Sequence, residues 1–280
     1  MSRGGPMDVS KVRIVVVHPD LLGTYGDGGN AVVLAQRLRW RGIEAEVLQA
    51  ASDLPLPASA DLYCLGGGED GPQSASVAAL RSDGSLVATV AAGAAVIAVC
   101  AGFQVVGESF PGADGRRREG LGLLDVRAER GHGPRAVGEL VAADASGLGL
   151  GLLTGYENHG SVTRLGSGVS ALATVRRGVG NGAGDGTEGA LCGHVVGTYL
   201  HGPVLARNPV LADLLLSWVV GPLGALDDTD VLRLRAERLR RAQAGRGLLR
   251  RLSGGARLAR PARPGRPWPT SGARGLRRGP

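Results

Sequence analysis

The sequence is poor in lysine, aromatic residues and cysteine. Its 280 residues include a single lysine, Lys11, and only 3% aromatic residues, so the core must be built from Val, Leu, Ile and Ala. The three cysteines, Cys64, Cys100 and Cys192, are far apart and form no Cys-x-x-Cys pair. This pattern argues against a disulfide framework or a zinc knuckle and favours a reducing cytoplasm.

Nucleotide-binding motifs are also missing. The sequence has no GxxxxGK[ST] loop and no GxGxxG between a strand and a helix, and Lys11 precedes the first predicted strand. We therefore expect no ATP or dinucleotide site and no metal site in this chain, so an ATP-dependent step would need another chain. The uncharged stretch Leu86–Phe103 is long enough for a membrane helix, but it divides into an Ala-rich helix and a buried strand.

Positive charge is concentrated at the C-terminal end. The formal net charge is +7, but residues 231–280 contain 15 Arg and one acid, so residues 1–230 carry a net negative charge. A nucleic-acid function is therefore not indicated. Residues 244–280 are rich in Arg, Gly and Pro, which predicts a disordered tail after a domain over 11–243, and we expect residues 1–10 to be flexible.

Strands and helices alternate in the first half of the chain. Apolar runs predict strands at 12–17, 44–48, 61–65 and 96–99. Helices are predicted at 31–41, at 74–93 with a break at 82–84, and at 101–108, the first of them capped by Asn30. This order predicts an α/β fold with a mostly parallel sheet flanked by helices and a ligand site at the carboxyl ends of the strands. Short alternating strands over 121–199 predict a mixed section, followed by helices at 208–219 and 228–242.

The segment around Cys100 has the pattern of a nucleophile elbow. Cys100 directly follows a buried strand, and the small residues Ala101 and Gly102 permit the sharp turn into a helix. The N-terminus of that helix would favour the reactive thiolate, and the Ala101 N–H would be free to stabilise an oxyanion. The alternative is a buried structural cysteine.

Gly66–Gly68 follow another predicted strand and supply a second element of such a site. Glycines let backbone N–H groups converge on an anion, so Gly67 or Gly68 is a candidate for the second oxyanion donor. A cysteine nucleophile also needs a base. His201, at the end of the predicted strand in GTYLHGP, is the first candidate, and His159 in GYENHG is the second.

Taken together, these residues resemble the class I (triad-type) glutamine amidotransferases. The combination consists of CAGFQ at 100–104, GGG at 66–68 and the late His201. Three further motifs resemble the cobyric-acid-synthase-like branch, and most closely the glutaminase subunits (GatD) of lipid II isoglutaminyl synthase: HPDLLGTYGDGGN at 18–30, GYENHG at 155–160 and GTYLHGP at 197–203.

The resemblance implies a flavodoxin-like fold and a glutaminase reaction. Cys100 would form a glutamyl thioester from L-glutamine, and His201 would transfer the proton to the leaving ammonia. Arg135, in PRAVGEL, would bind the substrate α-carboxylate, and Gln104 would support the elbow and the bound glutamine.

The resemblance also implies a partner. Ammonia would pass to a Mur-ligase-like synthetase subunit (MurT), which would bind ATP and Mg²⁺ and amidate D-glutamate in the lipid II stem peptide, the precursor of peptidoglycan. This chain itself would carry no cofactor. We expect it in the cytoplasm, with the inner face of the membrane as a further location.

One departure from the family concerns the third catalytic residue. Many triad amidotransferases carry His-x-Glu, whereas Pro203 stands two residues after His201. Either a Cys-His dyad suffices or an acid comes from elsewhere, for example from the partner. Alternative functions are an amidotransferase subunit for another acceptor such as a corrinoid, a scaffold without turnover, and a cysteine peptidase.

Overall fold

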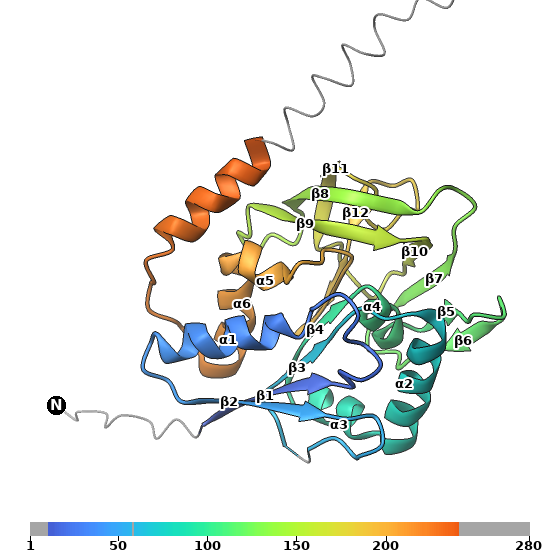
Figure 1. Cartoon of the computed structure of the whole chain (residues 1–280), viewed down its shortest axis with the longest axis horizontal. Coiled ribbons are helices and arrows are strands. Elements are labelled where there is room, and N and C mark those ends of the chain that lie inside the picture. The colour runs from blue at the N-terminus through green and yellow to red at the C-terminus, as the bar shows by residue number, and fades with distance from the viewer. Residues whose placement is uncertain (1–10, 58, 241–280) are drawn as a thin grey trace, which may run out of the picture. The chain divides into compact units, whose positions relative to one another are not determined.

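The computed structural model describes residues 11–57 and 59–240 of the chain, and a six-stranded sheet forms its centre (Figure 1). The strand order is β13-β14-β4-β3-β1-β2, and every neighbouring pair is parallel except β13 and β14. The predicted α/β fold with a mostly parallel sheet is therefore confirmed. The strands are β1 (Val12–Val17), β2 (Ala45–Ala50), β3 (Leu62–Leu65), β4 (Ala95–Val99), β13 (Ala190–Cys192) and β14 (Val195–Thr198).

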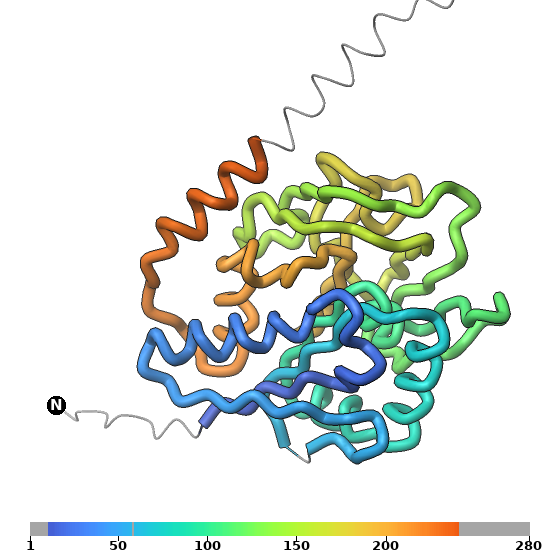
Figure 2. The backbone as a smooth tube through the Cα atoms, in the orientation of Figure 1, coloured from blue at the N-terminus to red at the C-terminus, as the bar shows by residue number. Residues whose placement is uncertain are grey.

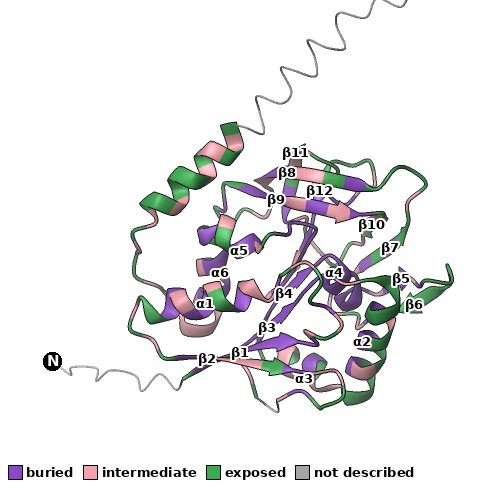
Figure 3. Cartoon of the chain, viewed as in Figure 1, coloured by how far each residue is buried: buried purple, intermediate pink, exposed green. Residues whose placement is uncertain are grey.

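Helices cover both faces of this sheet. Helices α1 and α6 pack on one face, and α2, α3 and α4 lie on the other (Figure 1). Strands β3 and β4 are buried along their whole length, as their continuous apolar sequences require (Figure 3). The helices are α1 (Gly29–Arg39), α2 (Asp70–Asp83), α3 (Ser85–Ala91), α4 (Ala101–Val106), α5 (Val204–Arg207) and α6 (Pro209–Val220).

Two four-stranded sheets make up the mixed section predicted between β4 and β14. One has the order β10-β7-β5-β6 and the other β12-β11-β8-β9. Of the strands in these two sheets, the sequence analysis predicted those at β7, β8 and β11 and missed β5, β6, β9, β10 and β12. Their bounds, with those of the other strands, are β5 (Ser109–Pro111), β6 (Arg117–Glu119), β7 (Val126–Arg130), β8 (Ala136–Asp144), β9 (Leu152–His159), β10 (Ser161–Leu165), β11 (Ala173–Arg177) and β12 (Thr187–Glu188).

The N-terminal helix α1 packs beside the C-terminal helices α5 and α6, although these are far apart in sequence (Figure 2). Arg37 of α1 is buried and bonded to Asp213 of α6 and to Asp228. The predicted cap by Asn30 is wrong, because α1 begins two residues earlier than predicted, at Gly29, and Gly28 is its cap. The Asn30 side chain instead accepts a hydrogen bond from Leu205 N at 3.0 Å and joins α1 to α5.

The uncharged stretch 86–103 is not one helix. It divides into α3, β4 and the start of α4, as predicted from its sequence. Across residues 11–57 and 59–240, no helix combines the length and the apolar character that a membrane span requires. A further helical segment covers 229–240, and the predicted tail over 244–280 and the N-terminal residues 1–10 lie outside the described residues.

Close packing of α4 on β14 leads to a stability prediction. A Cβ at Gly197 would lie 1.9 Å from Phe103 Cδ2, so Gly197→Ala should force the ring or the strand to move. We expect the free energy of unfolding in urea to fall by about 1–3 kcal/mol.

Gly71→Ala is the matched control, because a Cβ at that exposed position in α2 meets nothing within 4 Å. It should leave the free energy of unfolding unchanged or raise it. Equal stabilities of Gly197→Ala and wild type would contradict this packing.

Candidate active site

Cys100 lies at a strained turn between β4 and α4. Its φ of 53° is positive, which is rare for a residue with a side chain and typical of a nucleophile elbow. Its N–H donates to Thr198 O at 2.9 Å, and Gly102 N donates to Gly66 O at 3.0 Å, so the turn is tied to β14 and to the glycine turn after β3. The backbone therefore holds the thiol at the carboxyl edge of the sheet.

His201 follows β14 at the same edge and is bonded to Asp27. Its Nδ1 lies 2.9 Å from Asp27 Oδ2, and both side chains are almost completely buried. The backbone of His201 pairs with Tyr156 of β9 through two hydrogen bonds of 2.7 and 3.1 Å. The imidazole is therefore fixed from two sides.

The electrostatics of His201 favour its charged form. Burial lowers the pKa of the imidazole, but the hydrogen bond to Asp27 and the neighbouring Cys100 thiol outweigh this effect and raise the pKa to about 10. Nε2, the other ring nitrogen, is buried and has no formed hydrogen bond among the described residues. An imidazolium beside a thiol favours the thiolate, so this pair is suited to nucleophilic attack and proton transfer.

Asp27 is the residue that the sequence analysis missed. The sequence analysis left open whether a Cys-His dyad suffices or an acid comes from elsewhere, and the structure places Asp27 of this chain against His201, across 174 positions of sequence. Asp27 lies in the loop between β1 and α1. The available signal was its place in a glycine-rich loop after a buried strand, since the carboxyl ends of parallel strands share one edge.

In the glycine turn after β3, the N–H of Gly67 binds Asp27, whereas the N–H of Gly68 remains available as an oxyanion donor. Gly67 N donates to Asp27 Oδ2 at 3.0 Å, so its N–H is already used. A Cβ at Gly67 would also lie 2.8 Å from both His201 Cε1 and Tyr25 Cδ2. The predicted oxyanion role is thus narrowed to Gly68 and Ala101, whose N–H groups donate no backbone hydrogen bond within the described chain.

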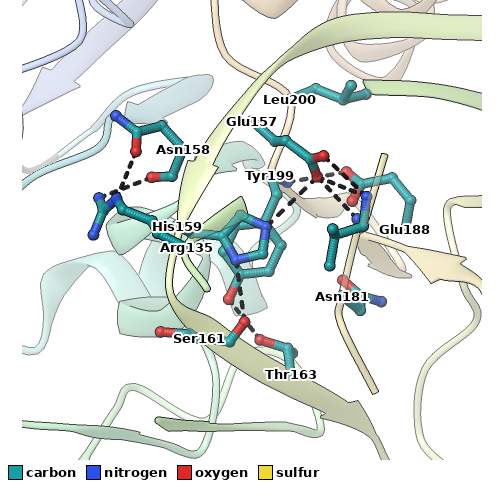
Figure 4. Close-up of polar contacts among 12 residues, drawn as sticks. Arg135, Glu157, Asn158, His159, Ser161, Thr163, Asn181, Glu188, Tyr199 and Leu200 are labelled. Atoms are coloured by element: carbon teal, nitrogen blue, oxygen red, sulfur yellow. Dashed lines mark hydrogen bonds and ion pairs between the residues drawn. The ribbon is translucent and has the colours of Figure 1, made fainter. Parts of the chain in front are cut away.

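Gln104 belongs to a buried hydrogen-bond network behind the elbow. Its Oε1 accepts from Gln73 Nε2 at 3.0 Å, and its Nε2 donates to the Tyr199 hydroxyl at 3.2 Å. The Tyr199 hydroxyl also bonds to Thr163 Oγ1 at 2.6 Å (Figure 4). Both ends of the Gln104 amide are hydrogen-bonded to the protein, which fits the predicted support of the elbow.

The predicted substrate ligand Arg135 lies in the loop before β8 and is exposed. Its Nε and Nη2 donate to Asn158 Oδ1 at 2.6 Å and Asn158 O at 3.0 Å (Figure 4). Among the described residues it has no acidic partner. Burial raises the pKa of Tyr25, and the nearby charge of Arg135 opposes this rise. The ring of Tyr25 packs against His201, with centroids 4.8 Å apart. This places the charge of Arg135 beside the site.

His159, the second candidate base, has a different environment. Its ring stacks on Tyr199 with centroids 3.9 Å apart, and its Nδ1 lies 3.1 Å from Ser161 O (Figure 4). Its Nε2 lies 3.8 Å from Glu157 Oε2. His159 therefore packs behind the site rather than against Cys100.

The other cysteines lack the surroundings of a nucleophile. Cys64 is buried in β3, and burial raises the pKa of its thiol, whereas Cys192 is exposed at the end of β13. In the described ranges, no group of three or more His, Cys, Asp or Glu side chains could hold a metal ion.

The family of the chain follows from comparison with known proteins. The model of the CobB/CobQ-like glutamine amidotransferase domain matches residues 13–209. The chain belongs to this glutamine amidotransferase family. It is therefore a glutamine-hydrolysing enzyme, and Cys100, Asp27 and His201 all lie inside the matched region.

Individual amidotransferases resemble the chain over most of its length. The GatD subunit of lipid II isoglutaminyl synthase from Staphylococcus aureus is 33% identical over 70% of this chain and 79% of its own length. The corresponding subunit from Streptococcus pneumoniae is 29% identical over 74% and 80%. A crystal structure of a glutamine amidotransferase with 23% identity has a TM-score of 0.53 over 74% of this chain and 98% of its own, which shows the shared fold.

The Asp27–His201 hydrogen bond leads to a prediction about pH dependence. Asp27→Asn should lower the pKa of His201 from about 10, because burial then acts without the opposing carboxylate. We expect kcat for glutamine hydrolysis to fall by roughly 10²-fold or more, since the imidazole loses its orientation. The measurement is the pH–rate profile of glutamate release.

The raised pKa of His201 also makes the stability of the folded chain depend on pH, because protonation and folding are linked. A raised pKa stabilises the folded chain fully below the ordinary value of 6.5, and this stabilisation is lost as the pH rises through about 10. The difference in free energy of unfolding between wild type and Asp27→Asn should therefore shrink as the pH rises from 6.5 to about 10. Asp20→Asn is the control, because Asp20 lies in the same loop but bonds to Ser52 instead of His201. An unchanged pH–rate profile of glutamate release in Asp27→Asn would refute the triad.

Proposed function

We propose that the chain is the glutaminase subunit of a lipid II isoglutaminyl synthase. The observation that carries the catalytic part is the buried Asp27–His201 pair beside the Cys100 elbow. The cell-wall part is supported by the two GatD relatives, which this chain covers over 79% and 80% of their lengths.

The first half of the reaction is acyl transfer to Cys100. The thiolate attacks the carboxamide carbon of L-glutamine, and the oxyanion that forms accepts hydrogen bonds from the N–H groups of Gly68 and Ala101. His201 gives its proton to the leaving nitrogen, which departs as ammonia and leaves a glutamyl thioester. Asp27 keeps the imidazole oriented and stabilises its charged form.

The second half returns the enzyme to its starting state. Neutral His201 removes a proton from water, and the hydroxide attacks the thioester carbon. Glutamate leaves, and Cys100 and His201 regain their original charges. Throughout both halves, Arg135 binds the α-carboxylate of the substrate, because its charge has no acidic partner in the described chain and lies beside Tyr25 at the site.

The ammonia then reaches a Mur-ligase-like synthetase subunit. This partner would bind ATP and Mg²⁺, because the sequence here has no phosphate-binding loop, and would amidate the α-carboxyl of D-glutamate in the peptidoglycan stem peptide. The partnership is supported by the relatives, each of which is named as one subunit of the synthase.

Loss of the Cys100 thiol should separate glutamine hydrolysis in this chain from amidation by the partner. Cys100→Ala should reduce glutamate release by at least about 10³-fold, because the nucleophile is missing. In a complex with the Mur-ligase-like subunit, ATP, Mg²⁺ and lipid II, this variant should stop glutamine-dependent amidation, whereas an added ammonium salt should restore it. Glutamate and amidated lipid II are measured by mass spectrometry.

Cys192→Ala is the control, because this thiol is exposed at the end of β13, and it should keep both activities. Amidation of a corrinoid acid with a corrinoid synthetase, and none of lipid II, would contradict the cell-wall assignment but keep the glutaminase. Absence of glutamate release from the wild-type complex would refute the catalytic assignment itself.

A further inference from the structure

A second buried carboxylate, Glu188, lies beneath the turn that leads to His201. It is the last residue of β12 and has no solvent-exposed surface. The catalytic steps above make no use of it. It stands 13 positions before His201 and belongs to a different sheet from β14, so its contacts with the end of β14 are tertiary.

One oxygen of Glu188 binds two successive residues at the end of β14. Oε1 accepts hydrogen bonds from the Thr198 hydroxyl and from Tyr199 N. The bond from Tyr199 N measures 2.9 Å (Figure 4). The Thr198 hydroxyl oxygen in turn accepts from Leu200 N at 3.0 Å. The three residues immediately before His201 are thus held from a single carboxylate oxygen.

Burial of this carboxylate is costly, and within residues 11–57 and 59–240 it forms no ion pair. Burial raises the pKa of Glu188, and its Oε2 has no hydrogen-bond partner in the part of the chain that the structure describes. A buried carboxyl group with one unsatisfied oxygen is expensive to keep for stability alone. Its hydrogen bonds all go to the turn, which points to a role in placing His201, the next residue along the chain.

We propose that Glu188 is a positioning residue for glutamine hydrolysis. By fixing Thr198–Leu200, its Oε1 holds the His201 imidazole between Asp27 and Cys100. The inference rests on the catalytic role proposed for His201. It does not depend on the acceptor of the ammonia.

The expected loss of kcat is limited, because the backbone of His201 is also bonded to Tyr156. Its backbone is still paired with Tyr156 of β9 when Glu188 is removed, so the imidazole would be displaced rather than released. Displacements on the scale of 1 Å cost about 10²-fold in rate, so Glu188→Ala should lower kcat by roughly 10- to 100-fold. KM for glutamine should change by less than about twofold, since the Arg135 and oxyanion contacts remain.

Conservative variants separate positioning from simple stability. Glu188→Gln keeps an acceptor oxygen in place and should recover most of the lost kcat. Thr198→Val preserves shape but removes the relay hydroxyl, so it should behave like Glu188→Ala. If Glu188→Ala does not fold, the comparison of Thr198→Val with Glu188→Gln tests the same inference.

Asp144 provides a matched control in β8. Its carboxylate likewise accepts from a hydroxyl and from backbone N–H groups, those of Ser146 and Leu150, at a turn that has no contact with His201. Asp144→Ala should lower the free energy of unfolding but leave kcat unchanged. Equal losses of kcat in Asp144→Ala and Glu188→Ala would show a general stability effect and overturn the inference.

The pKa of the His201 imidazole is a measurement that distinguishes a positioning role from a purely structural one. In histidine-¹⁵N spectra of the full chain, the signal absent from His201→Ala should titrate near pH 10 in wild type and at a lower pH in Glu188→Ala. If His201→Ala retains full glutaminase activity, the proposed catalytic role fails first. If His201→Ala is inactive while Glu188→Ala keeps the wild-type kcat and titration, only the positioning role fails.

Discussion

The hydrogen bond between Asp27 and His201 is the interaction on which the site depends. It joins the loop after β1 to the residues after β14, and the carboxylate also accepts from Gly67 N of the turn after β3. Three of the strands at the carboxyl edge are thereby linked through one buried oxygen. The resulting charge on His201 lies beside the thiol of Cys100, so the same bond sets both the geometry and the electrostatics around the proposed nucleophile.

The fold explains why so few groups are needed. In a parallel sheet the carboxyl ends of β1, β3, β4 and β14 lie at one edge, so each strand delivers one part of the site. In the proposed mechanism the elbow supplies the nucleophile, the glycine turn supplies an N–H and leaves room for the imidazole, and the segment after β14 supplies the base. The antiparallel part of the chain adds support, because Tyr156 of β9 and Glu188 of β12 hold the segment around His201.

The sequence predicted the local parts of this arrangement and missed a long-range one. The Cys100 elbow was predictable because strand, sharp turn and helix are consecutive, and His201 because it follows an apolar strand. Asp27 was missed because its partner lies 174 positions away and nothing local distinguishes it from other loop acids. Strand β9 was missed because it contains Glu157 and His159, which are polar but buried.

The most direct test of the account is to trap the acyl-enzyme. The full chain, in complex with its synthetase subunit, is mixed with L-glutamine, quenched in acid within the first turnover and analysed by peptide mass spectrometry. The account predicts one glutamyl group on the peptide that carries Cys100, and none in Cys100→Ala. A glutamyl group on Cys64 or Cys192, or glutamate release without any acyl-enzyme in wild type, would contradict it.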